Sequence, residues 1–328
     1  MGEGVRAAFG LAGGLALFLF GMENMSRALQ QAAGERMRGV LRRVTRTPLT
    51  GALAGLLVTA VLQSSSATTV MVIGFVSAGL MELPQAVAVV FGANVGTTMT
   101  AQLVAFRLAD WVFPILFAGV LVWLLARRER TRQLGLAVFS FGLLFDGIEV
   151  LSGAMAPLAE HPVFLRWMTQ VRHTPLLGLL GAGMTLVVQS SSATIAVLQR
   201  AAQQAGPDGI HSVLGLAGAL PILLGDNIGT TITAVLAAVG QPTDARRTAA
   251  AHCCFNLSGS VVCLLTLPWM IRLVEAVSPK GPELEVLARQ IANAHTLFNL
   301  LCTLVWLPLT PVMVRLVCKL VPQPQSSR

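Results

Sequence analysis

The chain has 328 residues, of which 54% are hydrophobic and only 12% carry a charge. Its mean hydropathy of +0.71 lies far outside the usual balance of soluble domains. The net charge is +8, but the Lys and Arg residues gather in connecting segments, so they mark membrane topology and exclude a nucleic-acid-binding surface. We therefore expect an all-α integral membrane protein that lies in a lipid bilayer.

Apolar runs of spanning or near-spanning length recur along the chain. The first run lacks an evident cleavage site before polar sequence, so we interpret it as a retained helix rather than a signal peptide. The runs extend over residues 7–20, 51–62, 70–83, 111–126, 134–150, 176–188, 261–271 and 297–317.

The chain repeats itself. The stretch Gln63–Thr68 (QSSSAT) returns unaltered as Gln189–Thr194, 126 positions later. Downstream, Gly92–Thr98 (GANVGTT) returns as Gly225–Thr231 (GDNIGTT), 133 positions later, which predicts an insertion near residues 203–211. These matches indicate a duplicated half. We predict a first transmembrane repeat over 1–126, a second over 133–274, a C-terminal transmembrane helix over 275–320 and a disordered tail over 321–328.

Two shorter matches accompany the duplication. Gly21–Glu23 corresponds to Gly147–Glu149, near the start of each half. In the last third of the chain, the pattern AHxxFN at Ala251–Asn256 reappears at Ala294–Asn299, which predicts two equivalent helices. The histidines of this pattern, His252 and His295, could be proton relays, but a lone His on an apolar helix is more often a packing residue.

Arginines indicate the orientation in the membrane. Residues 27–46 hold six and residues 127–132 hold four, whereas residues 156–174 hold two. The first two segments should therefore be cytoplasmic, together with Arg246 and Arg247 and the C-terminus. The first helix and its copy then run in opposite directions. We expect two inverted-topology repeats in the cytoplasmic (plasma) membrane, as in many secondary transporters.

In each half the Gln-Ser-Ser-Ser sequence lies between two apolar segments that are too short to span comfortably. This predicts a re-entrant or interrupted helix that stops at mid-membrane and restarts. Serines can satisfy the freed backbone groups or pack against neighbouring helices. Three consecutive serines cannot all face one neighbour, however, and they occur in both halves. The predicted substrate-binding residues are Gln63, Ser64, Ser65, Ser66, Gln189, Ser190, Ser191 and Ser192.

The Gly-x-Asn-x-Gly-Thr-Thr segments add glycines that let the backbone bend or approach a ligand, and amide and hydroxyl oxygens suited to a hard cation. A single copy could be a small-residue packing face. Because the segment is duplicated beside the serine clusters, we interpret it as a second arm of each half-site. The predicted sodium-binding residues are Gln63, Asn94, Thr97, Thr98, Gln189, Asp226, Asn227, Thr230 and Thr231; we expect no transition-metal site.

Hydroxyls and free N–H groups at half-helix N-termini favour an oxyanion. No Lys or Arg lies in the four motif segments, so a phosphate dianion there would carry a large desolvation penalty unless cations accompanied it. Small cations bound beside the anion would supply that charge, which indicates cotransport. Asp226 is the only acid in the four motifs, and Ala93 occupies its place in the first half.

The paired QSSSAT stretches, the GANVGTT and GDNIGTT segments and the AHTLFN-like helices resemble the type II sodium-dependent phosphate cotransporter family. The resemblance extends from about Leu15 to Pro311. It implies sodium-coupled uptake of inorganic phosphate by alternating access, with no cofactor besides the coupling ion. It also implies that Gln63–Ser66 and Gln189–Ser192 line the phosphate and sodium sites. Because Asp226 has no acidic counterpart, a sodium stoichiometry does not transfer.

Other functions fit less well. A sodium- or proton-coupled carrier of sulfate, arsenate or a dicarboxylate would have the same architecture. An ion channel is disfavoured by two inverted halves. An intramembrane hydrolase would need a base near its nucleophile, and neither serine cluster has one in sequence, so we do not expect an enzyme. Glu23 and Glu149 are either coupling groups or interfacial caps.

Overall fold

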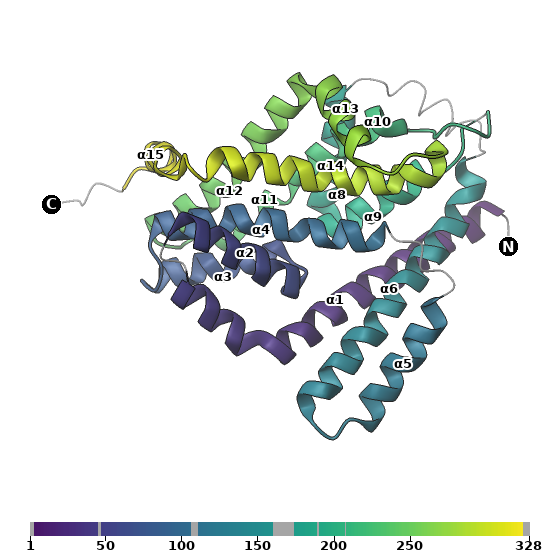
Figure 1. Cartoon of the computed structure of the whole chain (residues 1–328), viewed down its shortest axis with the longest axis horizontal. Helices are drawn as coiled ribbons and strands as arrows, with labels where there is room; N and C mark the ends of the chain where they lie inside the picture. The colour runs from purple at the N-terminus through teal and green to yellow at the C-terminus, as the bar shows by residue number, and fades with distance from the viewer. Residues whose placement is uncertain are drawn as a thin grey trace.

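The computed structural model describes residues 3–44, 47–105, 111–159, 174–188, 190–206 and 208–323. Apart from an isolated bridge between Ala205 and Ser212, all regular structure in these ranges is helical (Figure 1). The helices are α1 (Glu3–Val44), α2 (Pro48–Leu62), α3 (Ser65–Ser77), α4 (Leu83–Val104), α5 (Val112–Leu125), α6 (Glu129–Ala159), α8 (Thr174–Val188), α9 (Ser191–Ala202), α10 (Gly215–Gly229), α11 (Thr231–Ala237), α12 (Thr243–Leu265), α13 (Leu267–Val277), α14 (Glu283–Trp306) and α15 (Thr310–Leu320).

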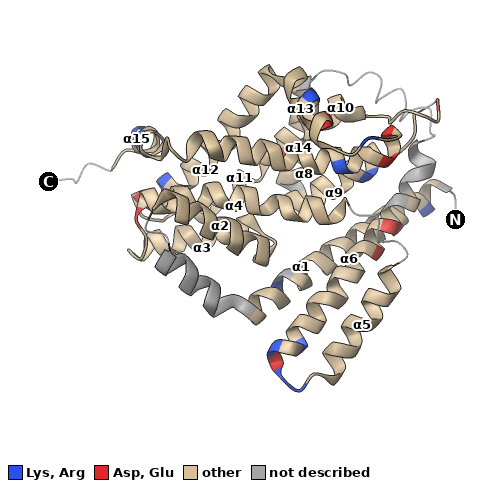
Figure 2. Cartoon of the chain, viewed as in Figure 1, with Lys and Arg blue, Asp and Glu red and all other residues tan. Residues whose placement is uncertain are grey.

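The helices confirm an integral membrane protein. Within the described ranges, five helices are long and apolar enough to cross a membrane, or six if α14 and α15, which are bent by 89°, count as one span. Figure 2 shows basic residues at the turn between α5 and α6, where the topology prediction requires a cytoplasmic connection. The inverted orientation of the two repeats stays a prediction, and the helix arrangement is compatible with it.

The long helices α1 and α6 lie side by side and carry the matching glycines of the two halves (Figure 1). A Cβ atom at Gly21 would lie 2.7 Å from the backbone nitrogen of Leu144, and one at Gly147 would lie 2.4 Å from that of Phe18. Small residues of this kind let membrane helices approach closely, which strengthens their packing in lipid. The match of Gly21 with Gly147 therefore marks the contact between the two halves.

The predicted interruptions of the membrane helices are confirmed. The first falls between α2 and α3, where Gln63 adopts a left-handed φ of 55°. The second falls between α8 and α9, and Ser190 caps the restarted helix. Each of these four helices has 15 residues or fewer and is therefore at most about 23 Å long, too short to cross a hydrocarbon core of about 30 Å.

The glycines of the duplicated Gly-x-Asn segments lie at close helix contacts. A Cβ atom at Gly92 on α4 would lie 1.7 Å from the carbonyl oxygen of Ala52 on α2. The matching Gly225 on α10 would meet the carbonyl oxygen of Gly178 on α8 at 1.9 Å. Helix α4 runs unbroken through its segment, whereas α10 gives way to α11 at Thr230. These glycines allow α4 to pack closely against α2, and α10 to pack closely against α8.

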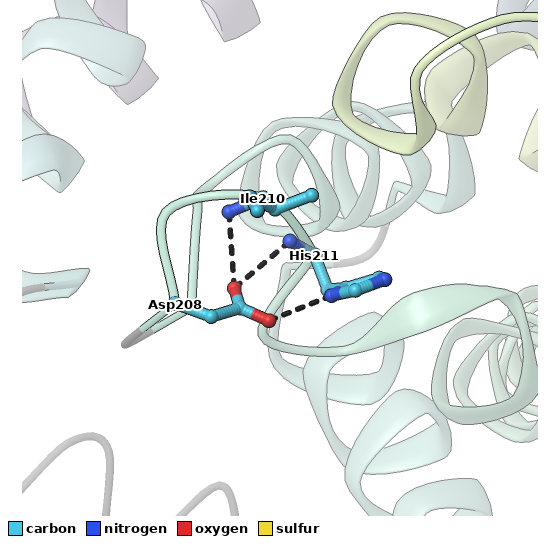
Figure 3. Close-up of polar contacts among 3 residues, drawn as sticks. All are labelled: Asp208, Ile210 and His211. Carbon is cyan, nitrogen blue, oxygen red and sulfur yellow. Dashed lines mark hydrogen bonds and ion pairs between the residues drawn. The ribbon is translucent and has the colours of Figure 1, made fainter.

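The insertion predicted near residues 203–211 forms a compact exposed loop between α9 and α10. Its centre is Asp208, whose carboxylate accepts hydrogen bonds from the backbone N–H groups of His211 (2.9 Å) and Ile210 (3.0 Å) and contacts His211 Nδ1 at 2.6 Å (Figure 3). The bonds from His211 hold the pKa of Asp208 at about 2. The same carboxylate raises the pKa of His211 above its ordinary value.

Candidate functional site

The two serine clusters meet at one cavity, although they are 126 positions apart in the chain. The cavity has a volume of about 220 Å³. It lies where the restarted helices α3 and α9 begin, next to α1. Its lining residues are Met22, Glu23, Gln30, Gln63, Ser64, Ser65, Ser66, Ala67, Thr97, Ser190, Ser191 and Ser192.

The first serine of each cluster starts the restarted helix. Ser64 Oγ accepts a hydrogen bond from the backbone N–H of Ala67 (3.1 Å), and Ser190 Oγ accepts one from Ala193 (3.3 Å). This is the usual role of serine at an N-cap. The N–H groups of the following serines have no acceptor within their helices, because the first turn of a helix lacks one. Two helix N-termini, each with a partial positive charge, therefore open onto the same cavity.

The described lining of the cavity contains no Lys or Arg. Its one described charged residue is Glu23, whose carboxylate pairs with Arg27 at 2.8 Å on an exposed part of α1. Glu149, the counterpart of Glu23, is not among the lining residues. An anion in this cavity would meet helix dipoles and hydroxyls but no opposite full charge from its described walls.

Gln63 lines the cavity, and both polar atoms of its carboxamide are hydrogen-bonded within the protein. Its Oε1 accepts a hydrogen bond from Thr100 at 2.8 Å, and its Nε2 donates to the carbonyl oxygen of Ala60. The matching Gln189 lies outside the described residues. Thr97 is the other predicted sodium ligand in the lining. The cavity therefore brings together seven of the eight predicted substrate residues and, besides Gln63, one of the predicted sodium ligands.

The predicted sodium ligands Asn94 and Asn227 are buried away from the cavity lining, and each faces a histidine. Asn94 Oδ1 lies 3.1 Å from His252 Nε2, and Asn227 Oδ1 lies 3.3 Å from His295 Nε2. Each Asn Nδ2 donates to a carbonyl oxygen of its own helix, at 3.0 Å for Asn94 and 2.9 Å for Asn227. The equivalent helices α12 and α14 thus hold the equivalent asparagines of α4 and α10.

The remaining threonines of the set bond to their own helices. The hydroxyls of Thr98, Thr230 and Thr231 donate to backbone carbonyl oxygens three or four residues earlier, at 2.8 to 2.9 Å. None of them is among the residues that line the cavity. In this structure their hydroxyls are bonded to the backbone of α4 and of the junction of α10 with α11.

Asp226 is completely buried between α10 and the second interrupted helix. Its Oδ1 accepts a hydrogen bond from Thr185 at 2.5 Å, and the Thr185 hydroxyl also lies 3.1 Å from that of Thr194. Its Oδ2 has no hydrogen-bond partner among the described residues. In the first half Thr59 and Thr68 bond to each other at 2.8 Å. Asp226 thus places a carboxylate next to the second interrupted helix, and one of its oxygens has no described hydrogen-bond partner. The first half has Ala93 at the matching position.

The family follows from comparison with known proteins. A family model described as Na+/Pi-cotransporter matches residues 17–153 and again residues 147–277. The chain belongs to the Na+/Pi-cotransporter family. The second match repeats the first in the other half of the chain, as the internal duplication requires.

Two relatives match most of this family member, and a third matches one third of it. The chain is 34% identical over 265 residues to the uncharacterized protein YqeW of Bacillus subtilis (strain 168). This alignment covers 80% of this chain and 83% of YqeW. The chain is 31% identical over 279 residues to the putative inorganic phosphate export protein YjbB of Salmonella typhimurium, covering 84% of this chain but only 50% of YjbB. The sodium-dependent phosphate transport protein 2A of Rattus norvegicus is 34% identical over 116 residues, 34% of this chain and 18% of that protein. No solved structure matches the chain.

The histidines are the feature of this Na+/Pi-cotransporter family member that the sequence interpretation left off the site. We predicted that His252 and His295 are packing residues, and both are indeed buried. Their partners are nevertheless the asparagines of the duplicated motifs. The signal was present, because the AHxxFN pattern and the Gly-x-Asn pattern each occur twice.

Proposed function

We propose that this protein carries inorganic phosphate across the membrane together with sodium ions by alternating access. The observation that carries the proposal is the cavity where two helix N-termini converge without a basic residue in its described lining. Membership in a transporter family and a relative named for sodium-dependent phosphate transport support it. We place the protein in the cytoplasmic membrane, with its C-terminus in the cytoplasm.

Phosphate would bind at the serine clusters. Backbone N–H groups and hydroxyls of Ser65, Ser66, Ser191 and Ser192 offer donors from two sides of the cavity, which suits a tetrahedral oxyanion. Both helix dipoles point their positive ends at the same place. A site assembled from both repeats can be opened to either side of a membrane when the halves move against each other.

Sodium would supply the missing positive charge. The charge of Glu23 is already paired with Arg27, but phosphate itself requires compensation in a lining without a described Lys or Arg. Oxygens of Gln63 and Thr97 lie at the cavity, and Asp226 has an open carboxylate oxygen behind it. We propose sodium at these positions and assign Asn94 and Asn227, whose oxygens face histidines, to holding α4 and α10 in place.

The serine site is tested by single alanine variants. Ser65→Ala and Ser191→Ala should each weaken phosphate binding by roughly ten- to a hundredfold, because a hydrogen bond to a charged group contributes about 1.5–3 kcal/mol. Ser77→Ala is the matched control: Ser77 ends the same helix α3, where its hydroxyl bonds to the Ile73 carbonyl and Gln241. Wild-type phosphate affinity in both cavity variants would contradict the site.

The driving ion is tested in the same binding assay. Phosphate affinity should fall when choline replaces sodium, because choline is too large to coordinate with the cavity oxygens. Phosphate binding that is unchanged in choline would show that protein charge, rather than bound sodium, balances the anion. Competition by sulfate, arsenate and a dicarboxylate in the presence of sodium would reveal a carrier of another oxyanion.

A second candidate function is phosphate export, since the YjbB relatives are named for it. A sodium symporter moves phosphate down the sodium gradient in whichever direction that gradient points. An exporter that does not use sodium would release phosphate from loaded vesicles equally well in choline. Efflux from phosphate-loaded vesicles with and without sodium therefore separates the two functions.

A further inference from the structure

The last third of the chain is a duplication of its own, longer than the AHxxFN pattern. His252 and His295 are 43 positions apart, and the same spacing relates Met270 to Met313 and Arg272 to Arg315. Each copy consists of a long helix followed by a short one, α12 with α13 and α14 with α15. The two short helices therefore have the same register.

Each short helix has three faces. One face is buried: Met270 and Val274 of α13 pack in one core cluster, and Met313 and Val317 of α15 pack in another. A second face is apolar and exposed, although no described protein element covers it. That face consists of Trp269, Leu273 and Val277 on α13 and of Val312, Leu316 and Leu320 on α15.

The third face is polar and exposed. It carries Arg272 and Glu275 on α13 and Arg315 and Lys319 on α15. At 100° per residue, the exposed apolar face lies between the buried face and the polar face in both helices. A helix of this kind fits a membrane surface, with one side on the protein, one in the acyl chains and one in water.

The two helices lie at opposite ends of a spanning helix. Helix α12 is long and apolar enough to cross a membrane, and α13 follows its end. Near its start, Arg247 donates a hydrogen bond to the carbonyl oxygen of Val321, just after α15. Helix α13 comes before the start of α14, and α15 follows its end at a bend of 89°. In Figure 1 α15 is therefore seen end-on beside the end of α14. Helix α15 therefore runs across the direction of α14.

We propose that α13 and α15 lie in the two opposite membrane–water interfaces, and that α15 binds the headgroups of anionic phospholipids. Helix α15 contains no acid, and its Arg315 and Lys319 make no salt bridge within the described residues. Arg247, whose Asp244 partner is 2.7 Å away, donates to the Val321 carbonyl and brings the basic start of α12 beside α15.

The charge on α13 differs. Arg272 is accompanied by Glu275 one turn later, and its guanidinium lies 5.3 Å from the ring centre of Trp269. Helix α13 therefore has no net charge with which to select a lipid headgroup. Juxtamembrane Lys and Arg attract anionic leaflets, so only α15 should distinguish anionic from zwitterionic lipid. This inference depends on the chain spanning a bilayer and not on the solute that it carries.

The placement is tested by spin labels on the full chain in lipid vesicles, in a variant whose five cysteines are replaced. Labels at 312 and 316, and at the matched positions 269 and 273, should be more accessible to oxygen than to a water-soluble nickel chelate. Labels at 315 and 272 should show the reverse. If the apolar-face labels are open to the nickel chelate, lipid does not cover them and the proposal is wrong.

Lipid selection is tested by thermal unfolding of the same full chain in phosphatidylcholine vesicles and in vesicles that also contain phosphatidylglycerol. Phosphatidylglycerol should raise the unfolding temperature of the wild type. The Arg315→Gln, Lys319→Gln double variant should lose most of that rise, and so should the wild type at high salt. Arg272→Gln is the matched control and should keep the rise. No rise in the wild type, or equal loss in both variants, would overturn the assignment of anionic lipid to α15.

Discussion

Two histidines deep in the helix bundle determine where the motif asparagines point. His252 donates to Asn94 from Nε2, and His295 does the same to Asn227, which requires the Nε2–H tautomer in each ring. All four side chains are buried. Removing the donor would leave a buried carboxamide oxygen without that bond, at a cost of about 1–3 kcal/mol. Thr97, one turn beyond Asn94, lines the cavity. A substitution at His252 should therefore change the position of Thr97 and the binding of ions in the cavity.

We predict that His252→Ala lowers the thermal stability and raises the sodium concentration needed for half-maximal phosphate transport. His252→Gln should restore most of both, because its amide can donate to the same oxygen. The exposed His211→Ala serves as the control and should leave the sodium dependence unchanged. If the Gln variant is as impaired as the Ala variant, the ring matters for packing volume and the positioning role fails.

Asp226 should be a cation-coupling group. Asp226→Asn preserves size and one oxygen but deletes the charge, so we predict weaker apparent sodium affinity and a changed dependence of transport on membrane potential. One elementary charge crossing the full field is worth about 2.3 kcal/mol per 100 mV, which is large enough to be measured in transport rates. A variant with unchanged sodium affinity and voltage response would show that Asp226 serves only as the hydrogen-bond acceptor of Thr185.

At the scale of elements, close contact between α4 and α2 holds the first serine cluster in place. A Cβ atom at Gly92 would lie 1.7 Å from a backbone oxygen of α2, which side-chain movement cannot relieve. We predict that Gly92→Ala destabilises the protein by about 1–3 kcal/mol or more, measured by thermal unfolding in detergent. Gly74→Ala on α3 meets no atom within 4 Å and should be neutral or stabilising. Equal effects of the two substitutions would argue against the helix contact.

The exposed loop between α9 and α10 should be most ordered at mildly acidic pH. The pKa of Asp208 is lowered from 3.8 to about 2. Its contribution to the stability of the loop is therefore present above pH 3.8 and is lost as the pH falls toward 2. The pKa of His211 is raised above 6.5, so its contribution is present below that pH and is lost as pH rises through the raised pKa.

Hydrogen exchange of the Ile210 and His211 amides, corrected for the intrinsic effect of pH, measures this order. Protection should be greatest between roughly pH 4 and 6, and Asp208→Asn should remove the pH dependence. Protection that does not change across this range would mean that the ion pair does not order the loop.

For the whole molecule, the sequence was most informative where the duplication was visible. Two identical QSSSAT stretches predicted both helix interruptions, because serines between short apolar segments have few other uses in a membrane. The matching Gly21 and Gly147 marked the contact of α1 with α6. The resemblance to the type II sodium-dependent phosphate cotransporters implied that both serine clusters line the binding sites, and the two clusters line one cavity.

Other features depend on contacts between distant helices and could not be read from local patterns. Asn94 and Asn227 have oxygens suited to sodium, but only the fold shows that His252 and His295 occupy them. The same holds for Glu23, whose place near a helix end suggested either a cap or a coupling group. Its presence in the cavity lining follows from how α1 packs against the interruptions.

The central claim is that phosphate and sodium bind and move together through a cavity that has no basic residue in its described lining. Radiolabelled phosphate uptake into proteoliposomes containing the full chain tests this most directly, with an inward sodium gradient in one sample and equimolar choline in the other. We predict saturable uptake that requires sodium and is lost when an ionophore collapses the sodium gradient. Phosphate uptake of equal rate in choline, or no phosphate movement in either condition, would contradict the account.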